Sequence, residues 1–169
     1  GYQAGGLGVI EGNDNVVIGY SAGYDLTTGA SNVLIGRDAG ANITEGTNNI
    51  VIGAYALDAA NGTGSGAEAY NVAIGHSALS AETSGAEGCV AVGFETLLTQ
   101  DREDSANTAV GYKALRVLGN GVTYGGIRNT AVGFQAGALG VFGGGSDGHG
   151  DDNTLVGYRA GYAITTGSD

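Results

Sequence analysis

The side chains best suited to holding a metal ion lie together in the glycine-rich stretch 143–152. This stretch contains the carboxylates of Asp147, Asp151 and Asp152 and the imidazole of His149. Calcium prefers oxygen ligands, which clustered carboxylates and backbone carbonyls supply. The stretch occurs only once, however, and its composition is also that of an acidic loop exposed to solvent. We therefore consider two interpretations, a calcium site at these four residues and a loop that binds no cofactor.

Tyrosines form a second set of candidate binding residues, because their rings can stack on the rings of a sugar. The candidates are Tyr24, Tyr70, Tyr112, Tyr124, Tyr158 and Tyr162. Two of them, Tyr112 and Tyr158, follow a glycine that recurs along the chain. Most equivalent positions are aromatic as well, the exceptions being Arg37, Ala54 and His76. A ladder of rings that packs between coils or chains also explains this regularity.

Candidate catalytic groups are confined to one acidic cluster, Asp101, Glu103 and Asp104. Paired carboxylates can hydrolyse polysaccharides, but acids clustered beside Arg102 are also typical of a solvated loop. The sequence has no nucleophile motif, no phosphate-binding loop and no zinc-ligand spacing. We predict that the protein is not an enzyme and keep a polysaccharide-degrading spike as the alternative.

The composition excludes two classes of partner. Six Lys and Arg residues against 17 Asp and Glu give a formal net charge of −11, which repels nucleic acid and anionic membrane surfaces. No apolar run approaches the roughly 18 residues needed to span a membrane. The single cysteine, Cys89, cannot form an internal disulfide, and we interpret it as a small buried residue.

One nine-residue motif, Asn-x-x-(Ile/Val)-Gly-x-x-Ala-(Gly/Leu), recurs along the whole chain. Its glycine falls at positions 1, 19, 36, 53, 75, 93, 111, 133 and 157, so the repeats are 17 to 24 residues long. A fixed motif with variable spacers is typical of stacked repeat architectures. We predict one repeat domain, residues 1–169, of about nine coils. Because Gly1 already lies inside a repeat, we expect it to be a fragment of a longer fibre protein.

The first half of the motif is short, rich in β-branched residues and bounded by Asn and Gly, which predicts a strand. Its outer residues, such as Val16 and Ile18, share one face, which we assign to the interior. The middle residue, such as Val17, is apolar too, so we expect a neighbouring segment or another chain to cover it. The glycine then turns the backbone at positive φ into a second short strand that ends in alanine.

This pattern predicts an all-β fold, a parallel β-roll or β-solenoid with coils of about 17–24 residues. Identical positions would stack about 4.8 Å apart. The repeated asparagines would either form a side-chain ladder along the axis or cap their own turns. Three spacers are longer than the rest, at 58–70, 116–128 and 138–152. Such insertions project from one side of a solenoid, either as recognition loops or as solvated decoration.

The motif resembles the repeats of two related families over nearly the whole chain. Asn71-Val-Ala-Ile-Gly75 is similar to the head repeat of trimeric autotransporter adhesins, which build a trimeric left-handed β-roll. The stretches 107–115 and 129–137 resemble the Asn-Thr-Ala-Val-Gly-Tyr-x-Ala-(Leu/Gly) repeats of phage tail fibres. Those repeats often precede a self-cleaving chaperone domain of the endosialidase type. The coils here are longer than in the adhesin heads. Both resemblances imply a surface-exposed trimeric fibre.

We therefore expect a homotrimer that acts as a structural and adhesive fibre segment, extracellular, on a virion or cell surface. Its loops would contact a glycan or protein receptor of a host cell. A second alternative is a single-chain solenoid that binds a surface such as ice, which calls for regular outward rows of threonine. The spacer threonines are too irregular for that: Thr27, Thr28, Thr44, Thr83, Thr165 and Thr166.

Overall fold

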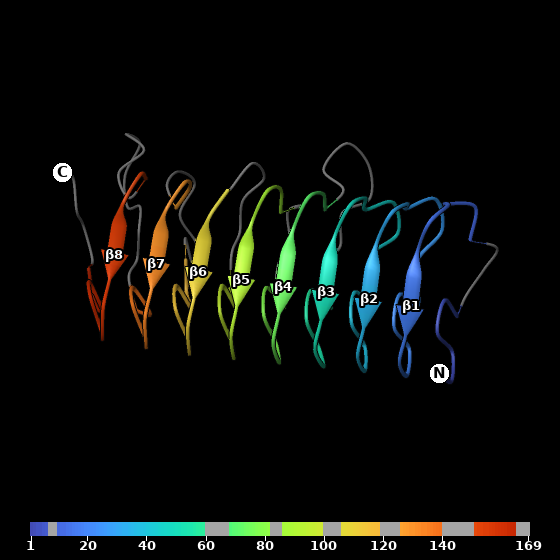
Figure 1. Ribbon diagram of the computed structural model, residues 1–169, viewed down its shortest axis with the longest axis horizontal. Helices are drawn as coiled ribbons and strands as arrows, with labels where there is room; N and C mark the ends of the chain where they lie inside the picture. The colour runs from blue at the N-terminus through green and yellow to red at the C-terminus, as the bar shows by residue number, and fades with distance from the viewer. Residues whose placement is uncertain are drawn as a thin grey trace.

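The protein is an all-β parallel solenoid, as the sequence predicts. A computed structural model describes residues 1–6, 10–59, 68–81, 86–99, 106–118, 126–139 and 151–164. Eight strands form a single parallel sheet in chain order, one strand per coil (Figure 1). They are β1 (Val16–Ile18), β2 (Val33–Ile35), β3 (Ile50–Ile52), β4 (Val72–Ile74), β5 (Val90–Val92), β6 (Thr108–Val110), β7 (Thr130–Val132) and β8 (Thr154–Val156). None of the described residues is helical.

Equivalent residues of neighbouring coils pair in register along the whole sheet. Val16 pairs with Val33, 17 positions later, and Thr130 pairs with Thr154, 24 positions later. The register is kept because every length difference falls between the turn of one coil and the asparagine of the next. Insertions therefore leave the stacked part of the molecule unchanged.

The orientation of the strands is the reverse of the one predicted above. The middle residues are inside, and Leu34, Val51 and Ala73 have no exposed surface, whereas Val16 and Ile18 are 45% and 55% exposed. Both faces of the strand are apolar, so hydrophobicity alone does not distinguish them. The size of the side chains does, because the middle residue is alanine in β4 to β7, which suits the narrow interior of a coil.

The segment after the repeated glycine is a turn and not the second strand that we predicted. Gly19 has φ of 144°, Ser21 has 50° and Gly23 has 52°, so left-handed residues alternate with right-handed ones and curl the chain tightly. The positive φ predicted for the repeated glycine is confirmed. A Cβ atom on Gly111 would collide with the carbonyl oxygen of Gly133 in the next coil. Only glycine fits this position, since the stacked backbones touch there.

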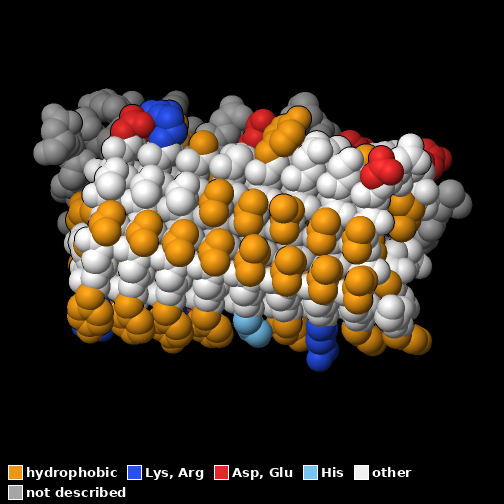
Figure 2. Space-filling model, in the orientation of Figure 1, with side chains coloured by type: hydrophobic (Ala, Val, Ile, Leu, Met, Phe, Trp, Pro, Cys, Tyr) orange, Lys and Arg blue, Asp and Glu red, His pale blue; other side chains and the backbone are white. Residues whose placement is uncertain are grey.

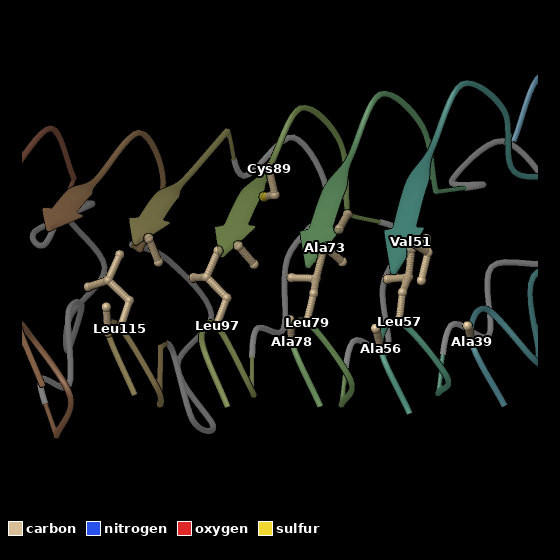
Figure 3. Close-up of a cluster of buried hydrophobic side chains, with 14 of the residues drawn as sticks. Ala39, Val51, Ala56, Leu57, Ala73, Ala78, Leu79, Cys89, Leu97 and Leu115 are labelled. Carbon is tan, nitrogen blue, oxygen red and sulfur yellow. The ribbon is translucent and has the colours of Figure 1, made fainter. Parts of the chain in front are cut away.

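Turn residues complete the core behind the strands (Figure 3). Ala56 and Leu57 are fully buried, and Leu79, Leu97 and Leu115 repeat the position of Leu57 in the next three coils. Where the strand centre is itself large, as at Leu34, glycine replaces this leucine: a Cβ on Gly23 or Gly40 would lie 2.8–2.9 Å from the Leu34 side chain. The exchange is local and not general, because β3 combines Val51 with Leu57 and β7 combines Ala131 with Gly137.

The asparagines form the ladder along the axis, one of the two roles considered for them. The Oδ1 atom of Asn49 accepts hydrogen bonds from the backbone N–H and the side-chain Nδ2 of Asn71, both at 3.1 Å. Asn32 does the same for Asn49 at 3.0 Å. At the position of Cys89 the ladder continues through the backbone, whose N–H donates to Asn71 Oδ1 at 2.9 Å. Cys89 is buried, in agreement with its interpretation as a small core residue.

Candidate functional site: an exposed apolar face and an aromatic column

The most unusual surface of the molecule is the outward side of the sheet. We call the first residues of the strands the first row, their third residues the third row, and the two together the sheet face. Figure 2 shows these apolar side chains in two parallel lines along the rod. Exposure reaches 42% at Ile50, 38% at Val132 and 68% at Val156. Continuous exposed apolar surfaces are typical of interaction sites.

The first row changes character along the rod. It is aliphatic in β1 to β5, with valine or isoleucine at each position, and becomes Thr108, Thr130 and Thr154 in β6 to β8. The third row is isoleucine or valine throughout. The sheet face therefore keeps at least one complete aliphatic line over its whole length.

A column of stacked side chains follows the C-terminal ends of the strands, at the lower edge of Figure 2. Ring centroids lie 5.0 Å apart between Tyr112 and Phe134 and 5.3–5.5 Å apart in the other ring pairs. We call the whole set the aromatic column. Its members are Tyr2, Tyr20, Arg37, Tyr55, His76, Phe94, Tyr112, Phe134 and Tyr158.

Three members of the column were missed by the sequence analysis, which treated Arg37, Ala54 and His76 as exceptions. His76 stacks on Phe94, with ring centroids 5.5 Å apart. The guanidinium carbon of Arg37 lies 5.6 Å from the centroids of both Tyr20 and Tyr55. Tyr55, one residue after the repeat position, supplies the ring that Ala54 lacks. The signal available in the sequence was the neighbouring tyrosine, since a guanidinium and a ring shifted by one residue can both continue a stack.

Further cations pack on this column. Lys113 Nζ lies 5.2 Å from the Tyr112 centroid, and the Arg159 guanidinium carbon lies 5.6 Å from that of Tyr158. Lys113 also pairs with Glu95 at 3.3 Å, and Arg116 Nε bonds the same carboxylate at 2.8 Å. The hydrogen bond from Arg116 and then that from Lys113 lower the pKa of Glu95. Arg37 likewise pairs with Asp38 at 3.2 Å, so this edge of the sheet combines rings with ion pairs.

Stacking limits what the candidate tyrosines of the column can do. Tyr112 lies between Phe94 and Phe134, at interplanar angles of 10° and 8°, so both of its ring faces are in contact. A sugar could reach only its edge. Tyr158 is more open, at 71% exposed. Among the other candidates, Tyr70 is 61% exposed, Tyr24 and Tyr162 are partly buried, and Tyr124 lies outside the described residues.

The proposed calcium ligands are only partly within the described chain. Asp147 and His149 lie outside it. Asp151 Oδ1 accepts a hydrogen bond from the Ile127 N–H at 3.0 Å, and both oxygens of Asp152 bind Arg128, at 2.6 and 2.8 Å. The hydrogen bond from Arg128 lowers the pKa of Asp152. Within the described ranges, no group of three or more His, Cys, Asp or Glu side chains could hold a metal ion.

The acidic cluster Asp101, Glu103 and Asp104 also lies outside the described residues. Elsewhere, one carboxyl has the character of a proton donor or acceptor near neutral pH. Burial raises the pKa of Asp58 to about 6, and the nearby charge of Asp38 adds to the rise. Hydrogen bonds from its own backbone N–H and from that of Ala59 lower the pKa and offset part of this effect. Within the described residues, no other carboxylate forms a hydrogen bond with Asp58.

The opposite edge of the sheet face lies just before the strands. We call it the entry edge. In most coils it consists of the residue immediately before the repeated asparagine. Before β5, where Cys89 replaces the asparagine, it consists of the two residues before Cys89. All of them are exposed: Asp14, Ser31, Asn48, Tyr70, Glu87, Gly88, Ala106, Arg128 and Asp152. Figure 2 shows carboxylates along this upper edge of the view.

Comparisons of the chain with protein-family models, with curated proteins and with solved structures give no match. Over the described part of the chain, no helix has the length and hydrophobicity to cross a membrane. The candidate site is therefore defined by its geometry: an apolar sheet face bordered by an aromatic column and by the entry edge.

Proposed function

We propose that the protein is a structural and adhesive fibre segment that self-associates through its sheet face, as a homotrimer. The observation that supports this most strongly is the uncovered aliphatic surface that runs along all eight strands. The chain does not need this surface for its own core, because the core is already completed by the strand centres and the turn residues. Parallel strands are normally buried on both faces.

A second copy of the chain is the occupant that fits this surface best. The sheet face repeats in every coil, so an identical rod can follow it over its whole length. Three flat faces around a common axis would enclose the six apolar rows and remove them from water. Three is the number implied by the resemblance to trimeric adhesin heads and phage tail fibres.

The adhesive role follows from rigidity and multiplicity. Register pairing and the asparagine ladder fix each coil to the next, while the three insertions at 58–70, 116–128 and 138–152 all enter at the same place in the coil. In a trimer each insertion is presented three times, so that weak contacts with a cell-surface glycan or protein add up to useful avidity. Such a fibre would act outside the cell, on a virion or a cell surface.

Attachment is tested by the binding of fluorescently labelled protein to a panel of bacterial and animal cells and to immobilised glycans. The comparison is between the wild-type chain and a chain in which the three insertions are shortened to the length of the other spacers. We expect binding by the wild type and its loss on shortening. Binding that survives the shortening would overturn the role of the insertions. If the wild type bound none of the surfaces, the adhesive role would be overturned and the segment would be a spacer.

A single-chain role has one observation in its favour. Thr108, Thr130 and Thr154 form a regular outward row beside Val110, Val132 and Val156, which the irregular spacer threonines did not predict. A flat, regular row of this kind is what an ice-binding solenoid requires. A monomer that depresses the freezing point below the melting point would favour this role over the fibre.

A further inference from the structure

We propose that the two edges of the sheet face form a seam between copies of the chain, with the aromatic column of one copy packed against the entry edge of the next. This inference rests on the proposed self-association and adds the contact that joins neighbouring copies. It assigns the aromatic column to an interface with another chain, in addition to its stacking within one chain.

The first argument is asymmetry. A two-fold interface needs a surface that is complementary to itself, whereas a cyclic assembly needs two different surfaces that fit each other. The two edges of the sheet face are clearly different. One presents stacked rings with Arg37, Lys113 and Arg159 against them. The other presents mainly small or polar side chains, with Tyr70 as its one aromatic ring.

The second argument is charge. The entry edge carries the exposed acids Asp14, Glu87 and Asp152 and the single cation Arg128, which is paired with Asp152. Three of the five Lys and Arg residues in the described ranges lie against rings of the column instead. Two of these cations are paired with acids of their own chain, Arg37 with Asp38 and Lys113 with Glu95, so the column edge has mixed charge. Two acidic entry edges would repel each other, whereas an entry edge can meet a column edge without this repulsion.

The third argument is the direction in which the rings are exposed. Because the rings stack face to face along the rod, their outer surface consists of ring edges, with 37% exposure at Phe94 and 42% at Tyr112 and Phe134. The edge of an aromatic ring carries partial positive charge. It is thus suited to the carboxylates of a neighbouring entry edge. Aromatic residues and arginine are also enriched in interfaces between proteins.

Crosslinking between two differently tagged copies tests the seam. One copy carries Ala54→Cys, beside the column, and the other carries Asn48→Cys or Ser31→Cys on the entry edge. These changes are mild: Ala54 is partly exposed, and the entry-edge position already accepts Ala106 and Arg128 at φ of 41° and 54°. The coexpressed copies are treated with a short bismaleimide, after their native mass has been measured by light scattering.

We expect the Ala54→Cys copy to crosslink to at least one of the two entry-edge variants, and none of the three to crosslink to its own kind. The wild-type chain, whose only thiol is the buried Cys89, serves as the control. A trimeric mass with crosslinks only between identical variants, or with none between the mixed copies, would overturn the seam but not the trimer. A monomeric mass would overturn the proposed self-association, and the seam with it.

Discussion

At the scale of single residues, the repeated asparagine ties each coil to the next through its side chain. Asn49 is fully buried and takes part in hydrogen bonds with Asn32, with Asn71 and with the backbone carbonyl of Glu68, the last at 2.9 Å. A buried polar group is stabilising only while its partners are present. The ladder therefore makes the stack of coils cooperative, because the loss of one amide affects the coils on both sides.

Replacing Asn49 with alanine tests the ladder. The change removes the acceptor of the Asn71 backbone N–H and one of the two donors to the Glu68 carbonyl, which keeps its hydrogen bond from the Thr47 N–H. We expect the free energy of unfolding to fall by about 3 kcal/mol. Asn42→Ala, at an exposed asparagine of the preceding spacer, is the matched control and should change stability by less than about 0.5 kcal/mol. Urea denaturation followed by circular dichroism measures both, and equal effects would contradict the ladder's role.

The stability of the folded chain should depend on pH through the carboxyl group of Asp58. Its pKa is raised from 3.8 to about 6 in the folded chain, so folding is favoured when the carboxyl is protonated. The stability that this group contributes is complete below about pH 4 and is lost as the pH rises through about 6. Glu95, whose pKa is lowered, acts in the opposite sense, so the effect of Asp58 is isolated by comparing variants.

We expect Asp58→Asn to gain stability relative to the wild type between about pH 4 and pH 8. Since the carboxyl is only half-buried, water screens the effect, which should be on the order of 1 kcal/mol. Thermal unfolding at the two pH values measures the difference. Glu11→Gln, an exposed change of the same charge, is the control. A pH-independent difference between Asp58→Asn and wild type would show that the carboxyl is not buried as described.

At the scale of the element, each strand is defined by the opposite roles of neighbouring residues. In β4, Ala73 has no exposed surface and Ile74 is 36% exposed. An aspartate at position 73 would place a charge inside the coil, whereas an aspartate at 74 would lie on the sheet face. The two substitutions should therefore have different consequences although the residues are adjacent.

We expect Ala73→Asp to prevent folding, because an unpaired buried charge costs several kcal/mol. Ile74→Asp should keep the β circular dichroism spectrum and a cooperative unfolding transition, and should weaken self-association. The pair is its own control, because the same side chain is introduced one residue apart. If Ile74→Asp unfolded the chain while Ala73→Asp did not, the sequence-based orientation of the strand would be right after all.

The repeat length, the strand position and the parallel register could be predicted from the sequence, because they depend on a motif that recurs in every coil. The orientation of the strand could not, because both of its faces are apolar and differ mainly in size, the middle residue being alanine in β4 to β7. The second strand was predicted between the turn glycine and the repeated alanine, whereas residues of positive φ such as Ser21 turn the chain there. The course of the column through Tyr55 depends on stacking between coils, which no single repeat shows.

At the scale of the whole molecule, the chain is a rod with a completed core and an apolar side that remains uncovered. The narrow coil buries its alanines and leucines efficiently, but it leaves two lines of aliphatic residues outside. A net charge of −11 keeps such a rod from associating without specificity. The proposed self-association would then be confined to the sheet face, where charge is absent.

The central claim is that identical chains cover this face, and the native mass of the protein tests it most directly. Light scattering on the purified chain, repeated after mild heating, should give a heat-resistant species of about three times the 16.6 kDa chain. The mass should stay constant over a wide range of protein concentration, because the buried face is large and apolar. A compact monomer at all concentrations would contradict the account and would move attention to a single-chain solenoid with an exposed flat face.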